Sequence, residues 1–101
     1  MTEQMSIERL EQNATKAESL MKALSNKHRL MILCLLQQGE LSVSALNELI
    51  PIPQSTLSQH LAWLRREKYV STRREAQTIY YQLDDSNVTK VINVLHGIFC
   101  D

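Results

Sequence analysis

The feature that most limits the fold is a pair of short helical patterns separated by a proline turn. The first pattern begins at Ser42 and stops at Pro51 and Pro53, which remove backbone donors and restrict the residues before them. The second begins directly afterwards and repeats one apolar side chain per turn, at Leu57, Leu61 and Leu64. We expect these leucines in the core, and a helix–turn–helix over about residues 42–68.

Two runs typical of β-strands follow, at 69–74 and 78–83, and both are rich in Val, Thr, Ile and Tyr. The three residues between them, 75–77, are few enough for a hairpin loop, so a β-hairpin is expected over about 69–83.

Helical patterns flank these elements. An amphipathic pattern covers 7–24, and an apolar run covers 29–38 between the capping residues Ser25 and Asn26 and a terminal Gly39. A last helix with a broad apolar stripe is expected over about 85–100. The order α-α-α-α-β-β-α predicts a mainly α fold with a β-hairpin, a winged helix-turn-helix forming one domain over 1–101.

Composition supports one small, mostly helical domain. The chain has 101 residues, only two glycines and two prolines, which argues against a sandwich or barrel. Eleven basic and eleven acidic residues cancel, so net charge alone does not indicate a nucleic-acid partner. Residues 54–74, however, hold five basic residues against one acidic residue, a local charge of +4. The second helix of the pair and the hairpin are therefore the basic part of the chain.

The second helix of the pair has the composition of a recognition helix. Short hydroxyls and amides near its start can reach base edges, while arginines contact phosphates. We expect base reading from Gln54, Ser55, Thr56, Ser58, Gln59 and His60. Phosphate contacts are expected from Arg65, Arg66, Arg73, Arg74, Gln77 and Thr78. Taken alone, the helix also fits an ordinary solvated amphipathic helix; its place between the proline turn and a basic hairpin favours DNA.

Three segments resemble the ArsR (ArsR/SmtB) family of bacterial winged-helix repressors: 23–33 (ALSNKHRLMIL), 57–61 (LSQHL) and 74–81 (REAQTIYY). The resemblance covers nearly the whole chain. It implies a homodimer joined through the first and last helices, an inverted-repeat operator in double-stranded DNA, and an inducer that releases the DNA. Packing within one chain would also explain the apolar stripes of those end helices.

Two cysteines, Cys34 and Cys100, suggest what kind of inducer releases the DNA. Taken singly, Cys34 fits a small buried hydrophobe in an apolar run. As a pair they resemble the dithiol branch of the family, whose members are called BigR, SqrR, YgaV or HlyU. That resemblance implies reaction with persulfides or oxidants and capture of one sulfur by the other, as a disulfide or a longer polysulfide. The inducer itself, reactive sulfur or oxidant, stays open.

No metal or other cofactor is expected. Metal-sensing members carry a Cys-x-Cys pair where this chain has Ser42 and Ser44, and the last helix offers a single His96. An enzyme with Cys34 as nucleophile is disfavoured because no base or glycine-rich oxyanion loop adjoins it. The sequence also fits an ArsR-type regulator that thiols do not control and, less well, a winged helix that binds only protein. Without a signal-like or membrane-spanning run, a cytoplasmic location with no membrane partner is expected.

Overall fold

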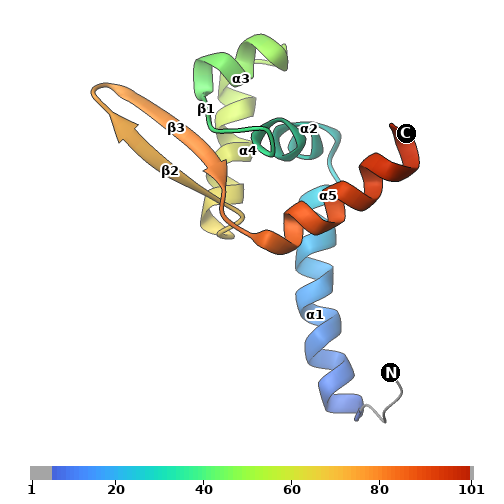
Figure 1. The fold of residues 1–101 in the computed structure, drawn as a ribbon. Helices are drawn as coiled ribbons and strands as arrows, with labels where there is room; N and C mark the ends of the chain where they lie inside the picture. The colour runs from blue at the N-terminus through green and yellow to red at the C-terminus, as the bar shows by residue number, and fades with distance from the viewer. Residues whose placement is uncertain (1–5, 101) are drawn as a thin grey trace.

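The computed structural model describes residues 6–100, which contain five helices and three strands (Figure 1). The ends of the expected domain, residues 1–5 and Asp101, lie outside it. The elements are α1 (Ile7–Leu24), α2 (Lys27–Leu36), β1 (Leu41–Ser42), α3 (Val43–Leu49), α4 (Gln54–Arg66), β2 (Val70–Glu75), β3 (Thr78–Leu83) and α5 (Ser86–Phe99). The strands form one antiparallel sheet in the order β1-β3-β2. The predicted mainly α fold with a β-hairpin is confirmed.

The core lies where α2, α3 and α4 meet one another and the sheet. Its members include Ile32 and Leu33 of α2 and Leu46 of α3, all fully buried. The recognition-helix leucines Leu57, Leu61 and Leu64 are also fully buried, as predicted. Burying each such side chain contributes about 1.5–3 kcal/mol. One face of α4 is therefore fixed, which leaves its other faces for solvent or a partner.

Side-chain caps explain where most helices begin. Asn26 starts α2, since its Oδ1 accepts from the backbone N–H groups of His28 at 2.9 Å and Arg29 at 3.1 Å. Ser25 instead belongs to the end of α1, where its hydroxyl donates to the Lys22 carbonyl. Asp85 caps α5 in the same way as Asn26 caps α2. The α1–α2 connection is therefore held by two adjacent polar residues with different roles.

Three details differ from the sequence expectations. The two-residue strand β1 was not predicted, because two residues carry no periodic pattern; it pairs Leu41 with Tyr81. The hairpin loop is shorter than expected, because Glu75 is still paired in β2. The cap residue of α2 is Gln37 rather than Gly39, although the Gly39 N–H still donates to the Leu36 carbonyl at 3.1 Å; the φ of 146° at Gly39 serves the turn into β1.

Helix α1 projects from the rest of the chain (Figure 1). The Cα radius of gyration is 15.5 Å, against about 13 Å for a compact domain of 100 residues. Only Ala23 of α1 is buried, and the Ser19 hydroxyl anchors the helix through a 2.8 Å hydrogen bond to the Tyr69 hydroxyl. No helix within residues 6–100 is long and apolar enough to cross a membrane.

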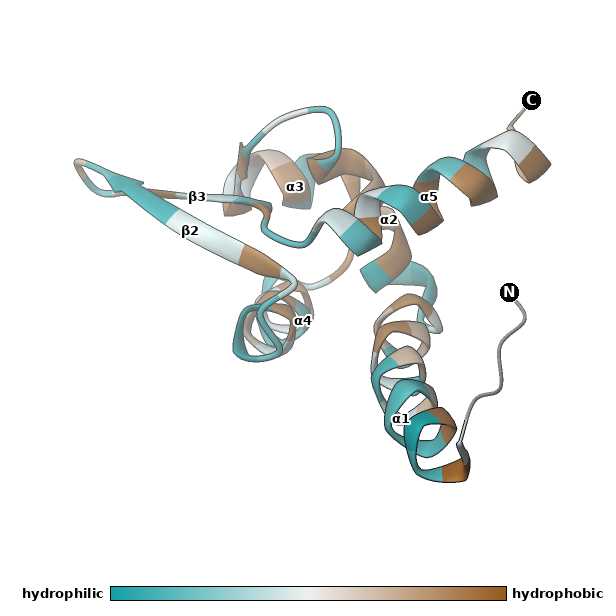
Figure 2. Cartoon of the chain, turned by 60° about the horizontal axis from the view of Figure 1, so that its bottom comes forward, coloured by the Kyte–Doolittle hydropathy of each residue, from teal (hydrophilic) through white to brown (hydrophobic). Residues whose placement is uncertain are grey.

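Large apolar side chains remain exposed on both end helices. Along α1 and α5 hydrophobic positions recur on the ribbon (Figure 2). On α5, Phe99 is 78% exposed and Ile98 63%; on α1, Ile7 is 74% exposed. A chain of this size rarely leaves such residues uncovered together. These end-helix faces are therefore surfaces that a partner can cover.

Candidate nucleic-acid interface and cysteine cavity

The proline turn that places α4 is pinned by a side chain that sequence reasoning missed. The amide of Asn47 donates to the carbonyl of Ile50 at 3.2 Å and of Ile52 at 2.8 Å. These bonds close the turn between α3 and α4. An asparagine ahead of a turn is a recognisable signal, but its partners three and five residues away become visible only in the fold.

The start of α4 is open to an incoming anion. Pro53 precedes the helix without a side-chain cap, and its carbonyl accepts from Thr56 and Leu57 at 3.0 Å each. No acidic residue occupies the first turn. Uncapped amides and the positive end of the helix dipole favour a phosphate here.

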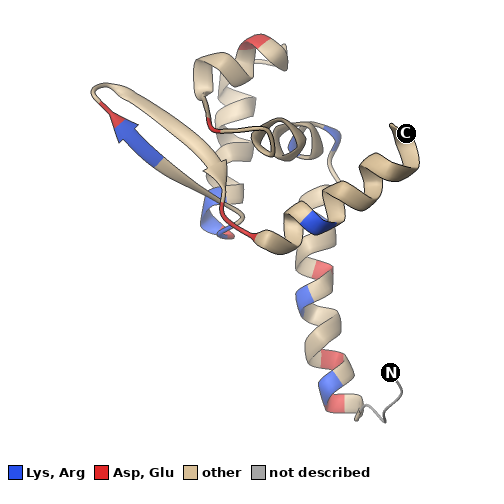
Figure 3. Cartoon of the chain, viewed as in Figure 1, with Lys and Arg blue, Asp and Glu red and all other residues tan. Residues whose placement is uncertain are grey.

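Most of the expected DNA-contacting side chains are exposed. Those of α4 are Gln54, Ser55, Ser58, Gln59, Arg65 and Arg66, and those of the hairpin are Arg73, Arg74, Gln77 and Thr78. Basic residues gather on β2 and at the C-terminal end of α4 (Figure 3). Thr56 and His60 are only half-buried rather than exposed.

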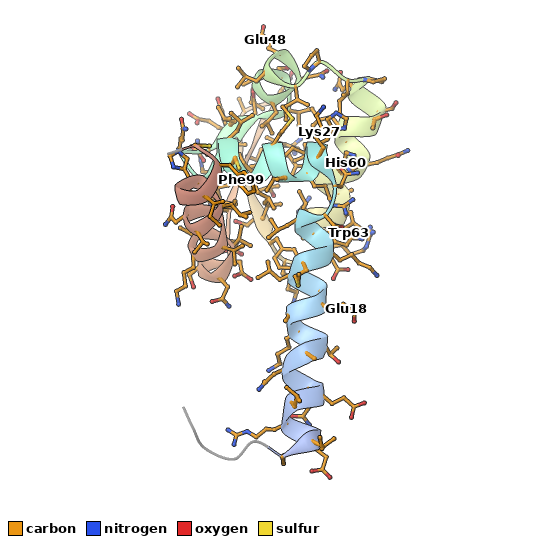
Figure 4. All side chains as sticks on the ribbon, turned by 90° about the vertical axis from the view of Figure 1, so that its right-hand side faces the viewer. Glu18, Lys27, Glu48, His60, Trp63 and Phe99 are labelled. Carbon is orange, nitrogen blue, oxygen red and sulfur yellow. The ribbon has the colours of Figure 1, made fainter. Side chains whose placement is uncertain are left out.

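His60 faces α2 rather than open solvent. Its ring lies 6.3 Å from that of His28, centroid to centroid, and Figure 4 places His60 beside the start of α2. Burial, followed by the positive charges of Arg29 and His28, lowers the pKa of His60 below 6.5. His60 therefore packs between α2 and α4, and its imidazole favours the neutral form.

Arg29 joins three helices at this point. Its Nε donates to the Ala23 carbonyl at 3.1 Å and its Nη2 to the Lys22 carbonyl at 2.8 Å, at the end of α1. Its guanidinium also lies 4.6 Å from the ring centroid of Trp63 in α4. The projecting helix and the recognition helix are thus fixed to the same side chain of α2.

The two cysteines share a cavity between α2 and α5. Both Cys34 and Cys100 are free and exposed, and both line a cavity of about 440 Å³. Apolar groups such as Leu30, Leu95 and Phe99 form much of the remaining wall. Exposure of Cys34 shows that its interpretation as a small buried hydrophobe is wrong. The fold has brought together two residues 66 positions apart in the sequence.

Polar contacts and electrostatics also link the two sides of this cavity. The side-chain amide of Gln37, the residue directly after α2, donates to the Asn93 side-chain oxygen of α5 at 2.6 Å. Partial burial, followed by the nearby Cys100 thiol, raises the pKa of Cys34 above its ordinary value. In the part of the chain described, no three His, Cys, Asp or Glu side chains gather as a metal site.

A helix–turn–helix with an exposed polar recognition helix, followed by a basic hairpin, defines a winged-helix DNA-binding protein. Comparison with known sequences narrows this class. Residues 26–72 match the family of bacterial regulatory proteins described as the arsR family, and curated relatives match along nearly the whole chain. The chain belongs to the ArsR family of transcriptional regulators, and its relatives are regulators rather than enzymes.

Two curated relatives show how close the similarity is. The transcriptional activator HlyU of Vibrio cholerae is 48% identical over 96 residues, which cover 95% of this chain and 89% of HlyU. The biofilm growth-associated repressor of Xylella fastidiosa is 42% identical over 96 residues, 95% of this chain and 84% of the repressor. A solved structure of reduced HlyU from V. cholerae N16961 has a TM-score of 0.89 and 47% identity, covering 94% of this chain and 100% of that one. The expected likeness to the HlyU and BigR branch is confirmed.

Proposed function

We propose that this chain acts as a homodimer on an inverted-repeat operator and releases it when the Cys34/Cys100 dithiol is modified by reactive sulfur species or oxidants. The observation that carries this proposal is the single cavity between α2 and α5 that both thiols line. Related proteins are described as activator or repressor; we propose repression by operator occupancy, in the cytoplasm.

The exposed faces of α1 and α5 support the homodimer. Their uncovered apolar side chains lie on helices at opposite ends of the sequence, and one twofold-related copy can cover both faces at once. Two recognition helices related by that axis would read half-sites about 34 Å apart. This geometry is what an inverted repeat requires.

For DNA contact we propose base reading by the exposed α4 residues Gln54, Ser55, Ser58 and Gln59, with Thr56 and His60 at the margin of that surface. Phosphate contacts fall to the uncapped start of α4, to Arg65 and Arg66, and to the wing residues Arg74, Gln77 and Thr78. Affinity should then fall steeply with salt, since each phosphate contact releases counterions.

Partial burial raises the pKa of Cys34, which supports a proposed order for the thiol chemistry. A low thiolate fraction makes Cys34 the poorer first nucleophile, so we assign the first attack to Cys100. Its thiolate takes the outer sulfur of a low-molecular-weight persulfide and releases the thiolate RS⁻. The Cys34 thiolate then attacks the inner sulfur of the Cys100 persulfide, which forms a disulfide and releases HS⁻. Two protein thiols are oxidised, and the persulfide is reduced to RS⁻ and HS⁻.

A direct disulfide needs Cα atoms about 4.4–6.8 Å apart, and a longer polysulfide bridges a wider gap. Either link ties α2 to α5, which lie on opposite sides of the cavity. Because α2 also contacts α4 through Arg29 and His28, a shift of α2 reaches the recognition helix.

The first experiment is mass spectrometry of the reduced protein after treatment with glutathione persulfide. We expect sulfur gain or loss of two hydrogens at Cys34 and Cys100, and trapping of a Cys100 persulfide in Cys34→Ser. Absence of any mass change at either cysteine would reject thiol sensing. If DNA binding is unchanged after persulfide treatment, the chain would instead be a regulator that a different signal controls.

A further inference from the structure

Arg73 of the wing has all its side-chain nitrogens occupied by carboxylates. Its Nε and Nη2 form a fork onto both oxygens of Glu40, at 3.1 and 2.6 Å. Its Nη1 donates to Glu75 at 2.9 Å, and its guanidinium lies 4.8 Å from the ring centroid of Tyr80. Three of the five guanidinium N–H donors are therefore used by carboxylates, and a phosphate at Arg73 would have to compete with these negative charges.

The fork spans the sheet from one edge to the other. Arg73 lies on the edge strand β2 and pairs with Tyr80 of the central strand β3. Glu40 directly precedes β1, the opposite edge, and follows α2 by four positions. Figure 3 shows the acidic position beside β1 and the basic segment of the wing. The wing is thereby tied to the end of the helix that carries Cys34.

The charges of this cluster also argue against a direct contact between Arg73 and DNA. One arginine against two glutamates gives a net charge of −1. The hydrogen bond from Arg73 lowers the pKa of Glu40 below its ordinary value, so the carboxylate stays ionised to a lower pH than an unpaired glutamate. An isolated exposed ion pair contributes little to stability. A bidentate arginine–carboxylate pair within a network of charges contributes more. Arg74 forms no ion pair within residues 6–100.

We propose that Arg73 is a positioning residue: held by Glu40, it fixes the wing against the end of α2, and Arg74 supplies the wing's arginine contact to the DNA backbone. The proposal rests on DNA binding by the recognition helix and wing. It assigns Glu40, an acidic residue outside the expected interface, a favourable part in DNA affinity.

A salt-dependence series separates positioning from phosphate contact. The probe is a fluorescein-labelled duplex of about 30 base pairs, selected by the wild-type protein from a random library to hold both half-sites. Arg74→Gln is the matched control, with the same charge change one residue along, and should reduce the slope of log K against log salt by about 0.9. Arg73→Gln and Glu40→Gln should each weaken binding and leave the slope at its wild-type value.

Combined variants test the pair directly. The double variant Glu40→Gln/Arg73→Gln should bind no more weakly than either single variant, a coupling of about twofold or more. Glu40→Arg combined with Arg73→Glu should bind better than either reversal alone. Tighter binding by Glu40→Gln, together with a reduced slope in Arg73→Gln, would overturn the proposal in favour of a phosphate contact at Arg73.

A measurement without DNA keeps the test independent of the proposed function. In Glu40→Gln, backbone amides of residues 70–83 should exchange hydrogen faster than in the wild type, while those of α4 stay unchanged. The Arg74→Gln control should exchange like the wild type. Unchanged wing exchange in Glu40→Gln would show that the fork does not position the wing, even if DNA binding itself is established.

Discussion

Replacing Arg29 by alanine tests how the projecting helix and the recognition helix are joined. The substitution removes two hydrogen bonds from a charged donor, to the Ala23 and Lys22 carbonyls, and the contact with Trp63. Charged hydrogen bonds contribute about 1.5–3 kcal/mol each and a cation–π contact about 0.5–1 kcal/mol. Because Arg29 is only half-buried, we expect a loss of about 2–4 kcal/mol in the free energy of unfolding.

The assay is urea unfolding followed by circular dichroism, with all variants at one protein concentration because the stability of the proposed dimer would depend on it. Arg29→Lys keeps the charge but lacks the planar fork, so it should recover less than half of the loss. Arg9→Ala, an exposed arginine of α1, is the control and should change stability by less than about 0.5 kcal/mol. An Arg29→Ala protein as stable as that control would refute the reasoning.

Three further predictions concern packing, pH and assembly. Leu61→Ala should destabilise the fold by about 2–5 kcal/mol in the same unfolding assay, since its side chain is fully buried. Because the pKa of His60 is lowered in the folded state, unfolding binds a proton, and stability should fall as pH drops below 6.5; His60→Gln should flatten this part of the curve, and an unchanged curve would contradict the assignment. Ile98→Glu should give a monomer by light scattering, whereas Lys90→Glu on the same helix should leave a dimer; a dimeric Ile98→Glu would reject the proposed interface.

The sequence was sufficient for the order of the long elements. Their periodic leucines, capping residues and prolines act locally, so helix α4 and its buried face could be predicted from about one turn of context. Strand β1 could not, because two residues form a strand only where Leu41 meets Tyr81 of the wing.

The candidate site was predictable as a set of residues but not as an arrangement. The composition of α4 indicated which side chains are polar, yet only the packing of α2 against it shows that His60 lies beside His28. Likewise, Arg73 and Arg74 are neighbouring arginines that the sequence alone does not distinguish. Their difference depends on Glu40, which the sheet brings close from 33 positions away.

The central claim is that the thiol state of Cys34 and Cys100 controls operator binding. The most direct measurement is fluorescence anisotropy of the selected duplex with the reduced protein and with the same protein after persulfide treatment, at one salt concentration. We predict at least about a tenfold loss of affinity, the equivalent of about 1.4 kcal/mol, which dithiothreitol reverses and which Cys34→Ser and Cys100→Ser lack. Equal affinity of the two wild-type states, with both cysteines shown by mass spectrometry to be modified, would contradict the claim.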